Sequence, residues 1–219
     1  AEVLAGDGRG GEGPAWDADL GILTSGRGGI HRLAPDGTHA LFRPDAGTNG
    51  LLFDREGRLL ACEPARRRVT RMDRSGAIEV LTDGFGGAPY NQPNDLAIDS
   101  HGRIWFSDAC YGGPQHLRQR TADGRPIEGV YRIDAPGRVT RVLGPDDVER
   151  ANGLLVSADD RFLFVADNCN DRVGGAGRLW RFALSPAGDV VPGSRRLLYD
   201  WGAGRGPDGV KHDVAGRLY

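Results

Sequence analysis

A short motif recurs five times along the chain: a polar residue is followed by a mainly apolar segment that ends at aspartate or serine. The copies are EGPAWD at 12–17, NGLLFD at 49–54, NDLAID at 94–99, NGLLVS at 152–157 and DGVKHD at 208–213. Their first residues, called the opening residues below, are 37, 45, 58 and 56 positions apart. Self-similarity at a period of about forty residues indicates a repeat architecture in which each unit is one supersecondary element.

Each unit continues with apolar segments of strand length that are separated by polar turns. The second segments are 22–24, 59–62, 104–107, 162–165 and the short 218–219, and the fourth segments are 40–42, 78–81, 139–143 and 197–199. The third segments share the pattern apolar-x-Arg-apolar, at 30–33, 69–72, 130–133 and 179–182. This alternation is typical of half-buried strands. The chain has 35 glycines among 219 residues, well above the usual share of about 7%. This glycine content favours tight turns between the strands.

Four antiparallel strands per unit at this period predict an all-β chain, a β-propeller in which each unit is one four-stranded blade and the first strand lines a central channel. Helical repeats would need a hydrophobic period of 3.6, which is absent, and an open β-sandwich is the weaker alternative. Four units are complete and the fifth stops at its second strand. We therefore expect residues 1–219 to be a single propeller domain whose C-terminal part is missing, from a six-bladed ring truncated after about four and a half blades.

Composition excludes several classes of function. The 28 basic residues (Lys and Arg) and 30 acidic residues are dispersed, so no nucleic-acid-binding stripe is indicated. No apolar run approaches the ~18 residues of a membrane-spanning helix, so we expect no membrane insertion. Three widely spaced cysteines indicate neither a disulfide framework nor a zinc-thiolate site. Because the chain begins at Ala1, a targeting segment would lie outside it, and the compartment, cytoplasmic or periplasmic, stays open.

The opening residues are expected to meet at one place. Because strands of a meander alternate in direction, the starts of all first strands lie on the same rim of a propeller. That rim would gather the side chains of Glu12, Asn49, Asn94, Asn152 and Asp208 around one mouth of the channel.

Carboxylate and amide oxygens are the ligands of hard divalent cations, and Ca²⁺ suits them best because it accepts 6–8 oxygens in flexible geometry. Glu12 and Asp208 would supply two negative charges, and Asn94 and Asn152 would add neutral oxygens. Zn²⁺, Mg²⁺ and Mn²⁺ are the alternative ions. A site left partly open to water or substrate is arranged for catalysis. The competing interpretation is structural: the same side chains would cap strand ends and bond loop amides.

Other polar groups fall on the two rims. The residues that follow the second strands belong to the rim of the opening residues: Glu63, Ser107-Asp108 and Asp167-Asn168. The closing aspartates of three motifs belong to the opposite rim, where an Asx-turn role suffices: Asp54, Asp99 and Asp213. Two longer insertions, 111–129 and 168–177, would either wall a pocket or only decorate the rim.

Four segments resemble the senescence-marker-protein/gluconolactonase family, also called the regucalcin-like lactonases. They are EGPAWD at 12–17, QPNDLAIDSHGRIWFSD at 92–108, ANGLLVSADDRFLFVADN at 151–168 and GPDGVKHDVAGRLY at 206–219. Together with the repeat, the resemblance spans the chain in order. It implies a six-bladed propeller that hydrolyses a sugar lactone to the aldonic acid with a divalent metal ion.

The resemblance also implies roles for individual residues. The metal ligands of the family fall on Glu12, Asn152 and Asp208, with Asn94 binding substrate or completing the metal shell. Asp208 is in addition the implied catalytic acid/base. One departure concerns the substrate: the position two before Asn94, an arginine in animal members, is Gln92 here.

The sugar hydroxyls need hydrogen-bond partners, and the candidates are Asn49, Asn94, Asp95, Glu63 and Tyr111. The expected partner is thus a small-molecule lactone, and the sequence leaves the oligomeric state open. Two alternatives remain: a phosphotriesterase resembling diisopropyl-fluorophosphatase, and a non-catalytic propeller that binds protein partners at its rim.

Overall fold

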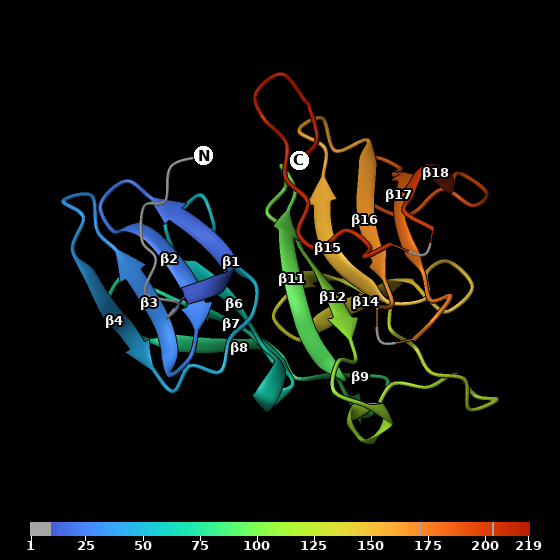
Figure 1. Ribbon diagram of the computed structural model, residues 1–219, viewed down its shortest axis with the longest axis horizontal. Helices are drawn as coiled ribbons and strands as arrows, with labels where there is room; N and C mark the ends of the chain where they lie inside the picture. Colours follow the sequence, from blue (N-terminus) through green and yellow to red (C-terminus); the bar gives the residue numbers. More distant parts are fainter. Residues whose placement is uncertain (1–9, 171, 203) are drawn as a thin grey trace.

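The computed structural model describes residues 10–170, 172–202 and 204–219 and is built from four four-stranded antiparallel sheets, each a simple meander (Figure 1). The expected all-β class and the four strands per unit are confirmed. Each predicted strand of the four complete units coincides with an observed strand apart from its ends.

The strands follow one another in chain order. Sheet 1 contains β1 (Gly10–Asp17), β2 (Gly21–Gly26), β3 (Gly29–Leu33) and β4 (His39–Pro44). Sheet 2 contains β5 (Leu51–Phe53), β6 (Leu59–Glu63), β7 (Arg68–Met72) and β8 (Ile78–Thr82). Sheet 3 contains β11 (Gln92–Ile98), β12 (Ile104–Ala109), β13 (Val130–Ala135) and β14 (Arg138–Leu143). Sheet 4 contains β15 (Ala151–Val156), β16 (Phe162–Asn168), β17 (Gly177–Ala183) and β18 (Arg196–Asp200). A small hairpin, β9 (Gly84–Phe85) with β10 (Ala88–Pro89), and two 3-10 turns, η1 (Pro64–Arg66) and η2 (Pro114–His116), complete the elements.

The apolar core lies between consecutive sheets. Leu23 and Ile30 of sheet 1 pack with Leu59 of sheet 2. The next layer joins sheets 2 and 3 through three fully buried aromatic side chains, which are Tyr90, Phe106 and Tyr131. A third layer joins sheets 3 and 4 and includes the fully buried Trp105. Face-to-face packing of this kind stacks the sheets side by side and holds their first strands in register.

The first strands of neighbouring sheets are in direct contact: β1 with β5, β5 with β11, and β11 with β15, the last pair lying side by side in Figure 1. Two glycines that follow opening residues make this approach possible. The N–H of Gly50 donates to the carbonyl of Asn94 at 2.7 Å, and the N–H of Gly153 donates to the carbonyl of Asp208 at 3.1 Å. A Cβ at either glycine would overlap that carbonyl oxygen, so only glycine fits. These two bonds link the segment of Asn49 to that of Asn94, and the segment of Asn152 to that of Asp208.

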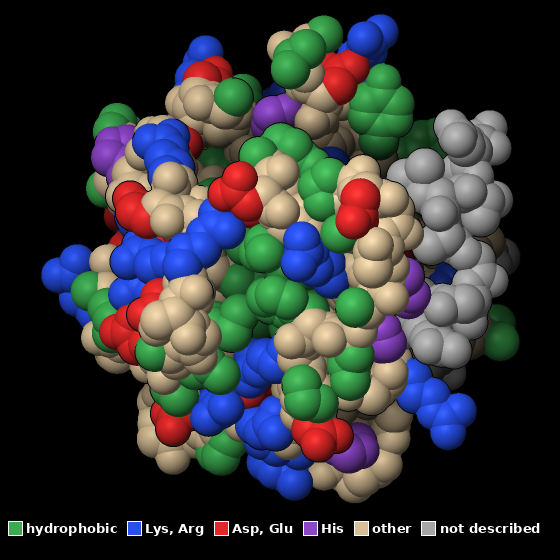
Figure 2. Space-filling view, turned by 90° about the vertical axis from the view of Figure 1, so that its left-hand side faces the viewer, with side chains coloured by type: hydrophobic (Ala, Val, Ile, Leu, Met, Phe, Trp, Pro, Cys, Tyr) green, Lys and Arg blue, Asp and Glu red, His purple; other side chains and the backbone are tan. Residues whose placement is uncertain are grey.

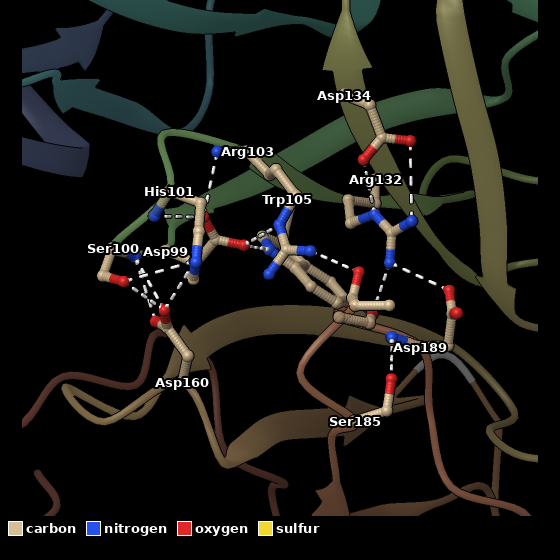
Figure 3. A network of polar contacts seen from close by, with 12 residues as sticks. Asp99, Ser100, His101, Arg103, Trp105, Arg132, Asp134, Asp160, Ser185 and Asp189 are labelled. Atoms are coloured by element: carbon tan, nitrogen blue, oxygen red, sulfur yellow. Dashed lines mark hydrogen bonds and ion pairs between the residues drawn. The ribbon is translucent and has the colours of Figure 1, made fainter.

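Polar contacts join sheets 3 and 4 at the other end of the strands (Figure 3). Arg132 pairs with Asp134 at 2.8 Å in its own sheet and with Asp189 of the β17–β18 connection at 3.1 Å. His101 and Asp160, from the first turns of the two sheets, approach to 3.1 Å. The rim at this end, called the turn rim below, is therefore a joint between sheets.

The four sheets form no closed ring within the described chain, so ring closure, the count of six blades and the missing C-terminal part stay predictions. The described residues contain no helix with the length and apolar character that crossing a membrane requires. On the face drawn in Figure 2, basic and acidic side chains are interspersed around an apolar strip.

Candidate functional site

All five opening residues line one cavity. It has a volume of about 390 Å³, and its walls are Gly11, Glu12, Gly13, Pro14, Asn49, Leu51, Asn94, Asp95, Asn152, Asp208, Gly209, Lys211 and Tyr219. The structure thus brings together the residues that the repeat predicts at one rim, called the cavity rim below. Their roles as ligands stay predictions.

Bulges in the first strands direct several of these side chains. The pairing of β1 with β2 shifts between Glu12 and Ala15, that of β11 with β12 between Pro93 and Leu96, and that of β15 with β16 between Ala151 and Leu154. Two of the opening amides, Asn94 and Asn152, therefore sit inside bulges. A bulge interrupts the ladder and re-aims the side chains at that point, a feature common beside binding sites.

The two acidic opening residues have no directly bonded partner for their side chains in the part of the chain that the structure describes. Among the described residues, neither Glu12 nor Asp208 has an ion pair or a side-chain hydrogen bond. Burial raises the pKa of Glu12, and the neighbouring charges of Asp208 and Asp95 raise it further, against an opposing effect of Arg205. An uncompensated negative field of this kind attracts a cation.

The donor set fits a hard cation only if amide oxygens take part. Within the described chain, no three His, Cys, Asp or Glu side chains gather closely enough to hold a metal by themselves. Asn94 and Asn152 are both buried against the cavity. The Nδ2 of Asn152 donates to the hydroxyl of Tyr111 at 2.8 Å, which leaves its Oδ1 as the atom that could accept a cation.

Asp95 lines the cavity, as a substrate-binding residue must, but its carboxylate already has partners. Its Oδ2 accepts the N–H of Leu154 at 3.0 Å and lies 3.6 Å from the ammonium of Lys211. Asp95 stands where the four other units have glycine, and its side chain takes over the link to the next first strand.

Glu63 does not line the cavity in this structure, and its predicted role in substrate binding gains no support. The side chain is fully buried, away from the cavity, where it accepts hydrogen bonds from Arg43 at 2.9 Å, Arg68 at 2.7 Å and Thr70 at 3.1 Å. Burial by itself would raise the pKa of Glu63, but the bonds from Arg68 and Arg43 outweigh it and bring the pKa below its usual value.

The repeat explains why Glu63 is structural. Its counterparts at the end of the second strand are Asp108 and Asp167. Asp108 accepts the N–H groups of Asn91 and Gln92, both at 2.8 Å, and Asp167 accepts those of Glu149 and Arg150. Carboxylates at this position hold the chain that enters or flanks the first strand.

Tyr111 also lies outside the cavity walls, and its contact with the sugar stays a prediction. Its hydroxyl stands behind Asn152, and its ring packs under the guanidinium of Arg150, 5.1 Å from the ring centre. Gln92 does not line the cavity either, and its Oε1 is buried without a hydrogen-bond partner among the described residues.

Lys211 is a charged residue of the cavity wall that no sequence motif indicated. It is the single lysine among the 28 Lys and Arg residues, and composition alone could have drawn attention to it. Its backbone is held by two hydrogen bonds to Tyr219, at 3.0 and 2.9 Å, while half of its side chain stays exposed.

The second insertion borders a different hollow. A cavity of about 610 Å³ is lined by residues of 169–175 together with Gly202, Gly204 and Arg205, and contains none of the opening residues. The smaller cavity of the opening residues is therefore the candidate site.

Comparison with known proteins identifies one family of similar proteins. Residues 10–219 match the family model described as the SMP-30/Gluconolactonase/LRE-like region. The whole of this chain aligns with a gluconolactonase of Zymomonas mobilis at 28% identity, and the alignment covers 66% of that relative's length. The structure of a gluconolactonase from Xanthomonas campestris is similar with a TM-score of 0.78 and 30% identity, over 98% of this chain and 70% of that one. A calcium-binding regucalcin from Agrobacterium tumefaciens shares the fold with a TM-score of 0.70 at 19% identity, over 99% and 68% of the two chains.

Proposed function

Because the chain belongs to the SMP-30/gluconolactonase/LRE-like family, we propose that the protein hydrolyses a sugar lactone to the aldonic acid and uses a divalent metal ion, with Ca²⁺ as the expected ion. The observation that carries the proposal is the cavity in which two unneutralised carboxylates and two amides meet. Gluconolactonase relatives support the reaction class.

Glu12, Asn94, Asn152 and Asp208 would hold the metal. Two carboxylates balance the charge of a divalent cation, and the amide oxygens add neutral donors, the ligand chemistry that Ca²⁺ prefers. When bound, the ion supplies a Lewis acid that polarises the lactone carbonyl. Without it, the acidic pair would repel the developing negative charge of the reaction.

Asp208 is the proposed catalytic acid/base. Its carboxylate takes a proton from the attacking water as the new C–O bond forms. It returns that proton to the ring oxygen as the ring C–O bond breaks, so that one carboxylic acid and one hydroxyl result, and the acid then releases its proton to solvent. The segment that carries Asp208 is well held, because its carbonyl accepts Gly153 N–H at 3.1 Å and the preceding Pro207 carbonyl accepts Asn168 Nδ2 at 2.8 Å.

The remaining cavity residues would bind the sugar. Asn49 lines the cavity with its side chain, while its backbone is fixed by bonds from Asn49 N–H to Cys62 and from Ser25 Oγ to its carbonyl. Asn49, Asn94, Asp95 and Lys211 offer donors and acceptors for several hydroxyl groups, as a polyhydroxylated lactone needs.

The test is hydrolysis of a panel of aldonolactones and one organophosphate triester, each measured with Ca²⁺, with Zn²⁺ and with EDTA. We expect metal-dependent lactone hydrolysis that EDTA abolishes. Cleavage of the triester alone would favour the phosphotriesterase alternative. Metal-loaded protein that opens no lactone above the spontaneous rate would sink the proposal and favour a binding module.

A further inference from the structure

A second layer of polar residues stands behind the cavity wall. Asn152 donates its Nδ2 hydrogen to the hydroxyl oxygen of Tyr111 at 2.8 Å, and that hydroxyl donates its own hydrogen to the backbone carbonyl of Asn168 at 3.1 Å. Tyr111 comes from the first insertion, Asn152 from β15 and Asn168 from the end of β16. The three residues are far apart in sequence and meet only at this point.

The direction of each bond is determined by chemistry. A carbonyl oxygen can only accept, so the single hydrogen of the Tyr111 hydroxyl is directed to Asn168. The hydroxyl oxygen can then only accept from Asn152, which must present its NH₂ group and not its oxygen.

Asn168 acts on the neighbouring ligand as well. It is buried, and its side-chain Nδ2 donates to the carbonyl of Pro207 at 2.8 Å, directly before Asp208. One residue therefore anchors the segment of Asp208 with its side chain and the hydroxyl of Tyr111 with its backbone. Both contacts lie outside the cavity walls.

We propose that Tyr111 and Asn168 are positioning residues that set the metal-binding orientation of Asn152 and Asp208 from behind the wall. This inference rests on the proposed metal site. Partners behind the ligands of a metal fix their orientation, and losing one typically weakens metal binding about 10–100-fold. Without the Tyr111 hydroxyl, the Asn152 amide is free to turn over and present NH₂ to the cation.

The test is Tyr111→Phe, with binding of Ca²⁺ alone and of Zn²⁺ alone measured by titration calorimetry on metal-free protein. We expect about 10-fold weaker binding of the ion that wild type prefers. Tyr90→Phe is the matched control, because Tyr90 is also a buried tyrosine whose hydroxyl has a side-chain partner, Thr82 at 2.9 Å, but lies away from the cavity. Metal affinity of Tyr90→Phe should stay within two-fold of wild type.

Asn168→Ala is the second variant. It removes the bond to Pro207 and keeps the backbone carbonyl that accepts from Tyr111, so it should weaken binding through Asp208 alone. Thermal unfolding of the metal-free variants separates a loss of stability from a loss of affinity. If wild type binds the metal and both variants bind it like Tyr90→Phe, the inference is overturned while the proposed function stands. If wild type binds neither ion, the metal site and this inference fall together.

Discussion

The aspartates that open and close the motif at 208–213 have different surroundings, although only five positions separate them. Asp213 accepts the N–H groups of Ala215 and Arg217, each at 2.9 Å, and pairs with the Arg217 guanidinium at 2.7 Å. Asp208 has no such partner among the described residues. The polar residue at one end of the motif completes a turn, and the one at the other end faces a cavity.

The same difference recurs around the molecule. On the turn rim, Asp54 pairs with Arg58 at 2.7 Å and Asp99 with Arg103 at 2.6 Å, each four residues on, and both accept turn N–H groups, as Figure 3 shows for Asp99. The predicted Asx-turns are thus confirmed. In the cavity, Glu12 and Asp208 have no ion pair or side-chain hydrogen bond among the described residues. Carboxylates whose bonds are satisfied nearby in sequence build the fold, whereas unsatisfied ones are available to a ligand.

The pKa directions agree with this contrast. The backbone N–H of Arg217 is the main cause of the lowered pKa of Asp213. Burial is the main cause of the raised pKa of Glu12, followed by the charge of Asp208. The surroundings of Asp213 on the turn rim therefore stabilise its negative charge, and those of Glu12 on the cavity rim do not.

The largest expected effect separates the two rims directly. Asp208→Ala should lower lactonase kcat by about 10³-fold or more, because it removes both a metal ligand and the acid/base. Asp99→Ala should leave kcat within a few-fold. It should instead lower the free energy of unfolding by about 2–4 kcal/mol, because Arg103 and the indole of Trp105 lose a buried acceptor.

Initial rates and urea unfolding of the two variants check this pair of outcomes. A similar loss of activity in both variants would mean that the assignment of the rims is mistaken.

A smaller effect is expected at Glu12, where function and stability should oppose each other. The raised pKa means that the contribution of Glu12 to stability is present below its unfolded-state value of 4.5 and is lost as the pH rises through the higher folded-state value. At pH 7, metal-free Glu12→Gln should therefore melt about 1–2 °C above wild type, a modest rise because solvent screens an exposed carboxylate. At pH 4 the two should coincide.

Calorimetric melting with and without Ca²⁺ completes the test at Glu12. Wild type should gain about 2.7 kcal/mol of stability at 100 times the dissociation constant, and the variant should lose most of that gain. If the metal-free variant is less stable than metal-free wild type at pH 7, the conclusion that the charge of Glu12 is uncompensated is contradicted.

The smallest expected effect compares one basic residue from each rim. Lys211→Met should lower kcat/KM for a polyhydroxylated aldonolactone about 10-fold, the equivalent of about 1.4 kcal/mol of substrate binding. Arg217→Met, which removes the partner of Asp213, should change kcat/KM less than two-fold. Steady-state kinetics with an unsubstituted lactone is the control, since it offers no hydroxyls to Lys211. An equal loss on both lactones would argue against a contact with the sugar.

Strand positions and the turn rim could be predicted because their causes are local. An apolar-x-Arg-apolar pattern selects a half-buried strand, and Asp with Gly and Arg at fixed offsets closes its own turn within five residues. The repeat also predicted which five residues share the cavity, because identical units that stack in order place identical positions on one rim.

The contacts that could not be predicted from the sequence are those that no local pattern encodes. Glu63 is bound by Arg43, twenty positions earlier in another sheet, and Tyr111 meets Asn152 across 41 positions. Lys211 reaches the cavity because its segment folds back against Asp95. Each depends on how the sheets and insertions pack.

The sequence by itself therefore determined the all-β units, their turns and the convergence of the opening residues, since these follow from periodicity and short-range hydrogen bonding. Only the tertiary structure decided which polar side chains remain available to a ligand. Availability depends on whether another sheet brings a partner within hydrogen-bonding distance, and that is a property of packing between units and not of any one unit.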